Sequence, residues 1–141
     1  MIKTVLVPQA FLFTLIVLGS AFFAFVTPQD QKQGAPWDVP IKYKELKNPY
    51  EGDKSLLKYG KSLYVKQCKT CHGAKGQGDG VAAVVLKTIP GDFTSDEFKK
   101  QTPGEIYYKF VMGRNEMPNF EKKIQDDEDK WAVVMYVQTL E

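Results

Sequence analysis

Histidine and cysteine are scarce in this sequence of 141 residues, which contains one histidine and two cysteines. A structural zinc ion needs four ligands of these types, so three such side chains in total argue against a zinc site. A lipid anchor on an N-terminal cysteine is excluded, because no cysteine precedes Cys68. Three side chains of these types therefore remain for a functional site.

Excess charge of one sign and strand-like patterns are also missing. The chain has 19 basic and 17 acidic residues, a net charge of +2. This balance argues against a nucleic-acid-binding protein, which would be strongly basic. No stretch alternates apolar and polar residues with the period of two that marks a half-buried strand. With 43% apolar residues, the chain can form one all-α domain with one additional segment.

The three scarce side chains fall within one short stretch, Cys68-Lys69-Thr70-Cys71-His72. Cys-x-x-Cys-His is the attachment sequence of c-type haem. On a helical turn, residues three and four apart share a face, so both thiols can reach the vinyl groups of one porphyrin while the imidazole points at its iron. We therefore predict one covalently bound haem c, attached through Cys68 and Cys71 and ligated by His72.

Two other interpretations of the cysteine pair are weaker. A thioredoxin-like redox pair would open a helix within a strand–helix–strand unit, and nothing around position 68 resembles such a unit. A structural disulfide between Cys68 and Cys71 would close so short a loop that it would stabilise the fold little. The sequence favours the haem interpretation over both.

An uncharged apolar run lies near the N-terminus. From Val5 to Val26 the chain has no charged side chain, and this run is long enough to span a membrane as a helix. The alternative is a cleaved signal peptide, with small residues for cleavage at 19–21. Because the apolar run continues beyond these residues, we predict an uncleaved transmembrane anchor at residues 1–26. Lys3 predicts that the N-terminus stays in the cytoplasm and that the rest of the chain lies outside.

Residues 27–52 are predicted to be a linker. They are polar, show no apolar period, and are interrupted by four prolines, Pro28, Pro36, Pro40 and Pro49. Three aromatic residues are too many for a fully solvated tether, namely Trp37, Tyr43 and Tyr50. We expect part of the linker to dock, either on its own domain or on a partner subunit.

Three main helices are expected in the domain at residues 53–141. Asp53 can cap the first, which leads into the haem motif. Gly60 is unusual inside this helix, because a mid-helix glycine costs about 1 kcal/mol relative to alanine. We expect that the last helix approaches closely there.

The second and third helices have clear starts. Residues 102–105 read Thr-Pro-Gly-Glu, which predicts a capping box with proline at the first helical position, and Gly113 ends this helix. The last helix is expected to open near Gln125 or Asp126. From Trp131 to Val137 it is apolar nearly all round, so it should be buried on more than one side.

A second ligand for the iron must come from another residue type, because the chain has no second histidine. Of the four methionines, Met117 lies in a loop between two helices, where no helical period accounts for an apolar residue. A thioether ligand favours ferrous iron and raises the reduction potential. We predict Met117 as the sixth ligand, with an open iron or another ligand as the alternatives.

From about Asp53 to Leu140 the sequence resembles a class I mono-haem cytochrome c of the bacterial type. The resemblance rests on five segments in this order: Gly60 to Tyr64 leading to Cys68–Gly73, then Gly76-x-Gly78-Asp79-Gly80, Leu86 to Phe93, Gly113 to Phe120, and Trp131 to Leu140. It covers the whole predicted domain. It implies that Gly60 and Tyr64 lie where the first and last helices cross, near Tyr136.

The same resemblance implies two further site residues. The Pro90 carbonyl is expected to accept the proton on the His72 ring and so to fix its tautomer and orientation. Arg114 is expected to contact a haem propionate.

An iron bound on both faces has no vacancy for a small-molecule substrate, so one-electron exchange is the expected activity.

We predict a membrane-tethered carrier on the periplasmic side of the bacterial inner membrane. Its respiratory donor could be a quinol-oxidising complex and its acceptor a terminal oxidase or another reductase. One alternative is a fixed haem subunit of a larger enzyme, resembling subunits of nitric oxide reductase, alternative complex III or a terminal oxidase. Another is a gas-binding haem protein.

Overall fold

A computed structural model describes residues 33–141 of the chain. The predicted anchor at residues 1–26 and the start of the linker lie outside this range. Within residues 33–141, no helix is both long enough and apolar enough to cross a membrane. The same residues form helices and no strand, and an isolated bridge joins Arg114 and Met117. The prediction of a helical domain is therefore confirmed.

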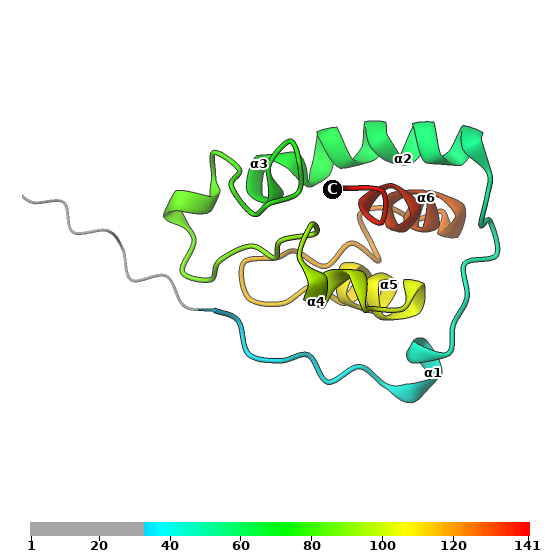
Figure 1. Ribbon diagram of the computed structural model, residues 1–141, viewed down its shortest axis with the longest axis horizontal. Helices are drawn as coiled ribbons and strands as arrows, with labels where there is room; N and C mark the ends of the chain where they lie inside the picture. The colour runs from blue at the N-terminus through cyan, green and yellow to red at the C-terminus, as the bar shows by residue number, and fades with distance from the viewer. Residues whose placement is uncertain (1–32) are drawn as a thin grey trace, which may run out of the picture.

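The helices follow one another around a central core (Figure 1). In chain order they are α1 (Ile41–Lys44), α2 (Lys54–Gln67), α3 (Lys69–His72), the 3-10 turn η3 (Ala83–Val85), α4 (Asp96–Lys99), α5 (Pro103–Met112) and α6 (Asp127–Val137). The three long ones, α2, α5 and α6, are those that the sequence predicted.

Helices α2 and α6 cross at Gly60. The Asp53 carboxylate starts α2 by accepting hydrogen bonds from the backbone N–H groups of Ser55 and Leu56, at 2.8 and 3.2 Å. At Gly60 a Cβ atom would collide with the Ala132 carbonyl of α6. One turn further along α2, the ring of Tyr64 lies 5.2 Å from that of Tyr136. The predicted close approach is confirmed.

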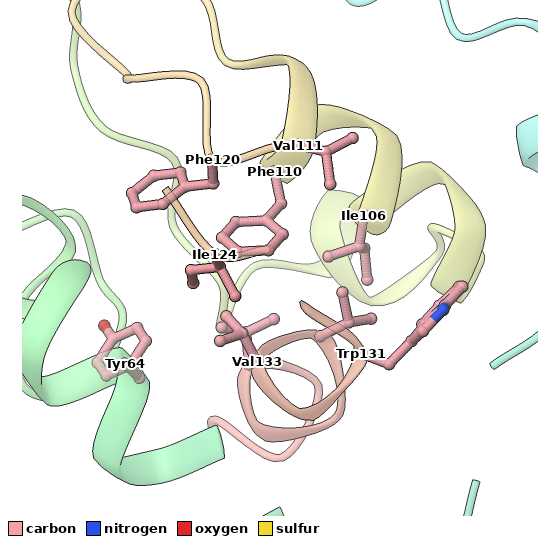
Figure 2. Packing of buried hydrophobic residues seen from close by; sticks show 10 residues of the cluster. Tyr64, Ile106, Phe110, Val111, Phe120, Ile124, Trp131 and Val133 are labelled. Atoms are coloured by element: carbon pink, nitrogen blue, oxygen red, sulfur yellow. The ribbon is translucent and has the colours of Figure 1, made fainter. Parts of the chain in front are cut away.

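Helices α5 and α6 supply most of the apolar core (Figure 2). The capping box between Thr102 and Glu105 starts α5, and Gly113 caps its end. Phe110 of α5 stacks on Phe120 of the following loop with ring centroids 5.0 Å apart. Helix α6 is buried on several sides, as its sequence predicted, by residues that include Trp131, Ala132, Val133, Val134 and Val137.

The described part of the linker, residues 33–52, docks on its own domain. It runs past α4 and α5 before it rises to α2 (Figure 1). Val39 is only 5% exposed, and the ring of Tyr43 lies 4.7 Å from that of Tyr108 on α5. The backbones come so close that a Cβ at Gly104 would collide with the Tyr43 carbonyl. Of the two alternatives that the sequence left open, docking on the chain's own domain is therefore the one that these residues show.

Candidate haem site

All six predicted site residues line one cavity of about 640 Å³. A volume of about 300–1,000 Å³ is typical of cofactor sites. Helix α3 and the segment that follows the 3-10 turn supply one part of its wall, and the loop after α5 supplies another. The six residues are Cys68, Cys71, His72, Pro90, Arg114 and Met117.

The Cys-x-x-Cys-His stretch forms the end of α2 and the single turn α3. The N–H of Cys68 still donates to the Tyr64 carbonyl at 2.8 Å, and the N–H of His72 donates to the Cys68 carbonyl at 2.9 Å. Successive helical hydrogen bonds therefore bring both thiols and the imidazole to the same cavity. Both cysteines are free and half-buried, so the pair forms no disulfide in the structure.

The His72 ring is held by a backbone carbonyl and by an aromatic ring. Nδ1 donates to the Gly91 carbonyl at 3.0 Å, and the ring stacks on Phe93 with centroids 4.4 Å apart. This corrects the expectation that the Pro90 carbonyl would be the acceptor. The Pro90 carbonyl packs instead against Gly78, where a Cβ would meet it. With Nδ1 engaged, Nε2 is the nitrogen available to a metal.

Burial shifts the pKa values of two groups in this wall. It lowers the pKa of His72, against the opposing effect of the hydrogen bond to Gly91, and so favours the neutral imidazole that binds metals. It raises the pKa of the Cys68 thiol to about 12, and the neighbouring Cys71 adds to this rise. A thioredoxin-like pair needs a lowered thiol pKa, so the environment of Cys68 argues against that interpretation.

Met117 is held by the backbone of its loop. The N–H of Arg114 donates to the Met117 carbonyl and the N–H of Met117 donates to the Arg114 carbonyl, both at 2.9 Å. The Glu116 carboxylate accepts from the Lys87 N–H at 3.2 Å and so joins this loop to the segment that leads to Pro90. The position of Met117 on the cavity wall therefore depends on backbone hydrogen bonds within its own loop and on the contact that Glu116 makes with one other segment.

Arg114 has an interaction that the sequence did not predict. Its Nη1 donates to the Pro36 carbonyl at 3.1 Å, and its guanidinium carbon lies 4.2 Å from the centre of the Trp37 ring. Residues 33–37 of the linker also line the cavity. The excess of aromatic residues in the linker indicated docking, but nothing in the sequence indicated where.

Lys109 was also missed. It lines the cavity from α5, and its Nζ donates to the Gln101 side-chain oxygen at 2.6 Å. Burial lowers the pKa of Lys109. In the sequence, Lys109 follows the helical period of α5 like an ordinary surface lysine, so nothing in the pattern marked it as a site residue.

These residues fit haem c. Two free thiols and an imidazole lie on adjacent turns, and a methionine thioether belongs to another part of the same wall. The cationic side chains of Arg114 and Lys109 suit the propionate carboxylates of the porphyrin. Apolar side chains suit its flat macrocycle, namely Ile106, Phe110, Phe120, Val133, Val134 and Val137.

Comparison with known proteins agrees with this chemistry. Residues 55–137 match the family described as cytochrome c oxidase, cbb3-type, subunit III, and the chain belongs to this family. The resemblance to class I mono-haem cytochromes c is thereby confirmed. The chain is therefore an electron-transfer haem protein, and its family implies covalently bound haem c.

Among solved structures, the chain is similar to one from the Kuenenia stuttgartiensis reducing HAO-like protein complex Kustc0457/Kustc0458. The two share 28% sequence identity with a TM-score of 0.59, over 77% of this chain and 51% of the other. This chain thus matches about half the length of that one. No curated protein matches the sequence significantly.

Proposed function

We propose that the protein carries single electrons on one haem c that is attached through Cys68 and Cys71 and ligated by His72 and Met117. The observation that supports this most strongly is that one cavity collects both thiols, the only histidine of the sequence and the loop methionine Met117. When bound, the haem supplies a one-electron iron couple. With both faces of the iron occupied, no position remains for a substrate.

The protein's own residues hold this site in place. The Gly91 carbonyl fixes the tautomer of His72 and leaves Nε2 as the ring nitrogen that can bind a metal. The paired hydrogen bonds between Arg114 and Met117 hold the methionine backbone. The apolar side chains of α5 and α6 exclude water, and the thioether favours the reduced state.

The proposal includes a tether. The uncharged run from Val5 to Val26 would anchor the chain in the bacterial inner membrane, with the haem domain on the periplasmic side. Covalent haem attachment through Cys-x-x-Cys-His agrees with an exported domain. The partners would be respiratory proteins, a donor such as a quinol-oxidising complex and an acceptor such as a terminal oxidase.

Axial ligation by Met117 is tested by carbon monoxide binding to the reduced protein. Wild-type protein should bind the gas poorly, because the thioether occupies the sixth position. Met117→Ala should bind it readily and should have a lower reduction potential. Met112→Ala is the matched control, because Met112 is exposed at the end of α5 and is absent from the cavity wall. Ready binding to the wild type, with spectra unaltered in Met117→Ala, would overturn the assignment and favour a gas-binding protein.

A second candidate function is that of a fixed haem subunit in a larger respiratory enzyme. Two observations favour it: the family description names an oxidase subunit, and the similar solved chain comes from a protein complex. Native electrophoresis of mildly solubilised membranes, stained for haem, separates the two candidates. Migration near the mass of the chain supports a carrier. Persistent migration with a large active complex supports a subunit.

A further inference from the structure

We propose that the segment from residue 33 to residue 39, here called the strap, positions the ligand Met117 through Arg114, with Trp37 as the positioning residue. This inference rests on the proposed function, in which Met117 binds the iron. It assigns a role in the electron-transfer site to a segment that precedes the helical domain in the sequence.

The first link joins the strap to the Arg114 side chain. The guanidinium lies over the Trp37 ring at 4.2 Å and donates to the Pro36 carbonyl at 3.1 Å. Arginine over an indole face is a favourable cation–π arrangement. Space around this contact is limited, because a Cβ at Gly34 would lie 3.1 Å from Arg114 Nη2 and 3.4 Å from Thr88 Cγ2.

The second link fixes the strap to α5. The Trp37 ring meets the Tyr108 ring edge-on with centroids 6.3 Å apart. Val39, two residues further on, is buried, and Tyr43 then packs on the same Tyr108 ring. Trp37 therefore contacts both Tyr108 on a long helix and Arg114 in the loop that follows it.

The third link runs from Arg114 to Met117 along the backbone. The two reciprocal hydrogen bonds between them close a short turn in which Asn115 has a φ of +53°, a conformation that few non-glycine residues adopt. A displacement of Arg114 would therefore displace Met117 as well. Residues 33–37, Arg114 and Met117 line the same cavity, so release of the strap would loosen this wall around the ligand.

The test compares variants of Trp37 in the haem-loaded, full-length protein. Three readouts report the iron–sulfur bond: the charge-transfer absorption of methionine-ligated ferric haem, the reduction potential, and carbon monoxide binding by the reduced protein. Trp37→Ala should weaken the absorption band, lower the potential and raise carbon monoxide binding several-fold. Trp37→Phe keeps an aromatic face for Arg114 and should restore most of the wild-type behaviour.

Two further variants complete the test. Trp37→Leu keeps apolar volume without the π face and should change the readouts in the same direction as Trp37→Ala, which covers the case in which the alanine variant does not fold. Tyr59→Ala, an exposed aromatic on α2, is the matched control and should behave as wild type.

The possible failures are distinguishable. If Trp37→Leu and Trp37→Ala keep all three readouts at wild-type values while Met117→Ala abolishes the absorption band, the strap has no positioning role and Met117 remains the ligand. If Met117→Ala itself leaves the band unchanged, the ligand assignment and the strap inference are both overturned.

Discussion

Tyr64 links the haem-attachment turn to the core of the protein. Its side chain is fully buried between α2 and α6, and its hydroxyl donates to the Gly73 carbonyl at 2.6 Å. Gly73 follows His72 directly and caps α3. The Tyr64 hydroxyl therefore supplies a hydrogen-bond donor for the backbone carbonyl at the end of the turn that carries the proposed iron ligand.

We predict that Tyr64→Phe lowers the free energy of unfolding by about 1–3 kcal/mol near neutral pH, because it leaves a buried carbonyl without its donor. The comparison is made by urea unfolding of the haem-loaded protein. Tyr59→Phe is the matched control, because it removes a solvent-exposed hydrogen bond, from the Tyr59 hydroxyl to the Asp129 carboxylate at 3.3 Å, and should lower the free energy of unfolding only slightly. An equal cost for both variants would contradict the role given to Tyr64.

The Tyr64→Phe variant also tests how the stability depends on pH. Burial raises the pKa of Tyr64, so the folded state keeps its proton where an unfolded tyrosine, of ordinary pKa about 10, would lose it. The resulting stability is complete below pH 10 and is lost as the pH rises above that value. The cost of Tyr64→Phe should therefore shrink above about pH 10. A cost that stays constant or grows above that pH would contradict this sign.

At the scale of elements, the crossing of α2 and α6 determines where the haem-attachment turn lies. The helices meet at Gly60, two turns before Cys68, and the chain continues from α2 into α3 with scarcely a break. The direction in which α2 leaves the crossing therefore sets the direction in which the two thiols and His72 enter the cavity.

We predict that Gly60→Ala destabilises the protein by about 1–3 kcal/mol or more, although alanine favours helices, because the added methyl group must push α6 away. Lys61→Ala, on the exposed side of the same helix, is the control. Thermal unfolding measures both. A Gly60→Ala variant as stable as Lys61→Ala would show that the crossing tolerates a side chain.

The sequence predicts a helix when the interactions that start or end it join residues close together in the chain. Asp53 and Thr102 cap helices through atoms two or three residues away, and a glycine such as Gly60 signals close contact without naming its partner. The short helices α1 and α4 span too few turns to show a period. His72 donates to the Gly91 carbonyl and not to that of Pro90 because of the direction in which each carbonyl faces after the segment folds against Gly78. Local sequence does not determine that direction.

At the scale of the whole molecule, the long helices, the loop after α5 and the strap line one cavity of about 640 Å³. Of the six predicted site residues, all reach this cavity. The Arg114–Trp37 contact was not predictable, because it joins residues far apart in the chain through a linker without periodic structure.

We predict that Cys68→Ser combined with Cys71→Ser leaves the domain largely unfolded. Without covalent haem, the apolar walls would lose the packing partner that fills the cavity, and a domain of this size has little other core to compensate. Circular dichroism and urea titration measure the loss, with Thr70→Ser in the same turn as the control. A cooperatively folded, haem-free double variant would contradict the prediction.

The proposal that the protein carries one electron on one haem c is tested most directly by a potentiometric titration of the full-length protein, followed by visible absorption. We expect a c-type haem spectrum that changes in a single wave, with about 59 mV for each tenfold change in the ratio of oxidised to reduced protein. A protein without haem absorption, or a titration with two separate waves, would contradict a single-haem electron carrier.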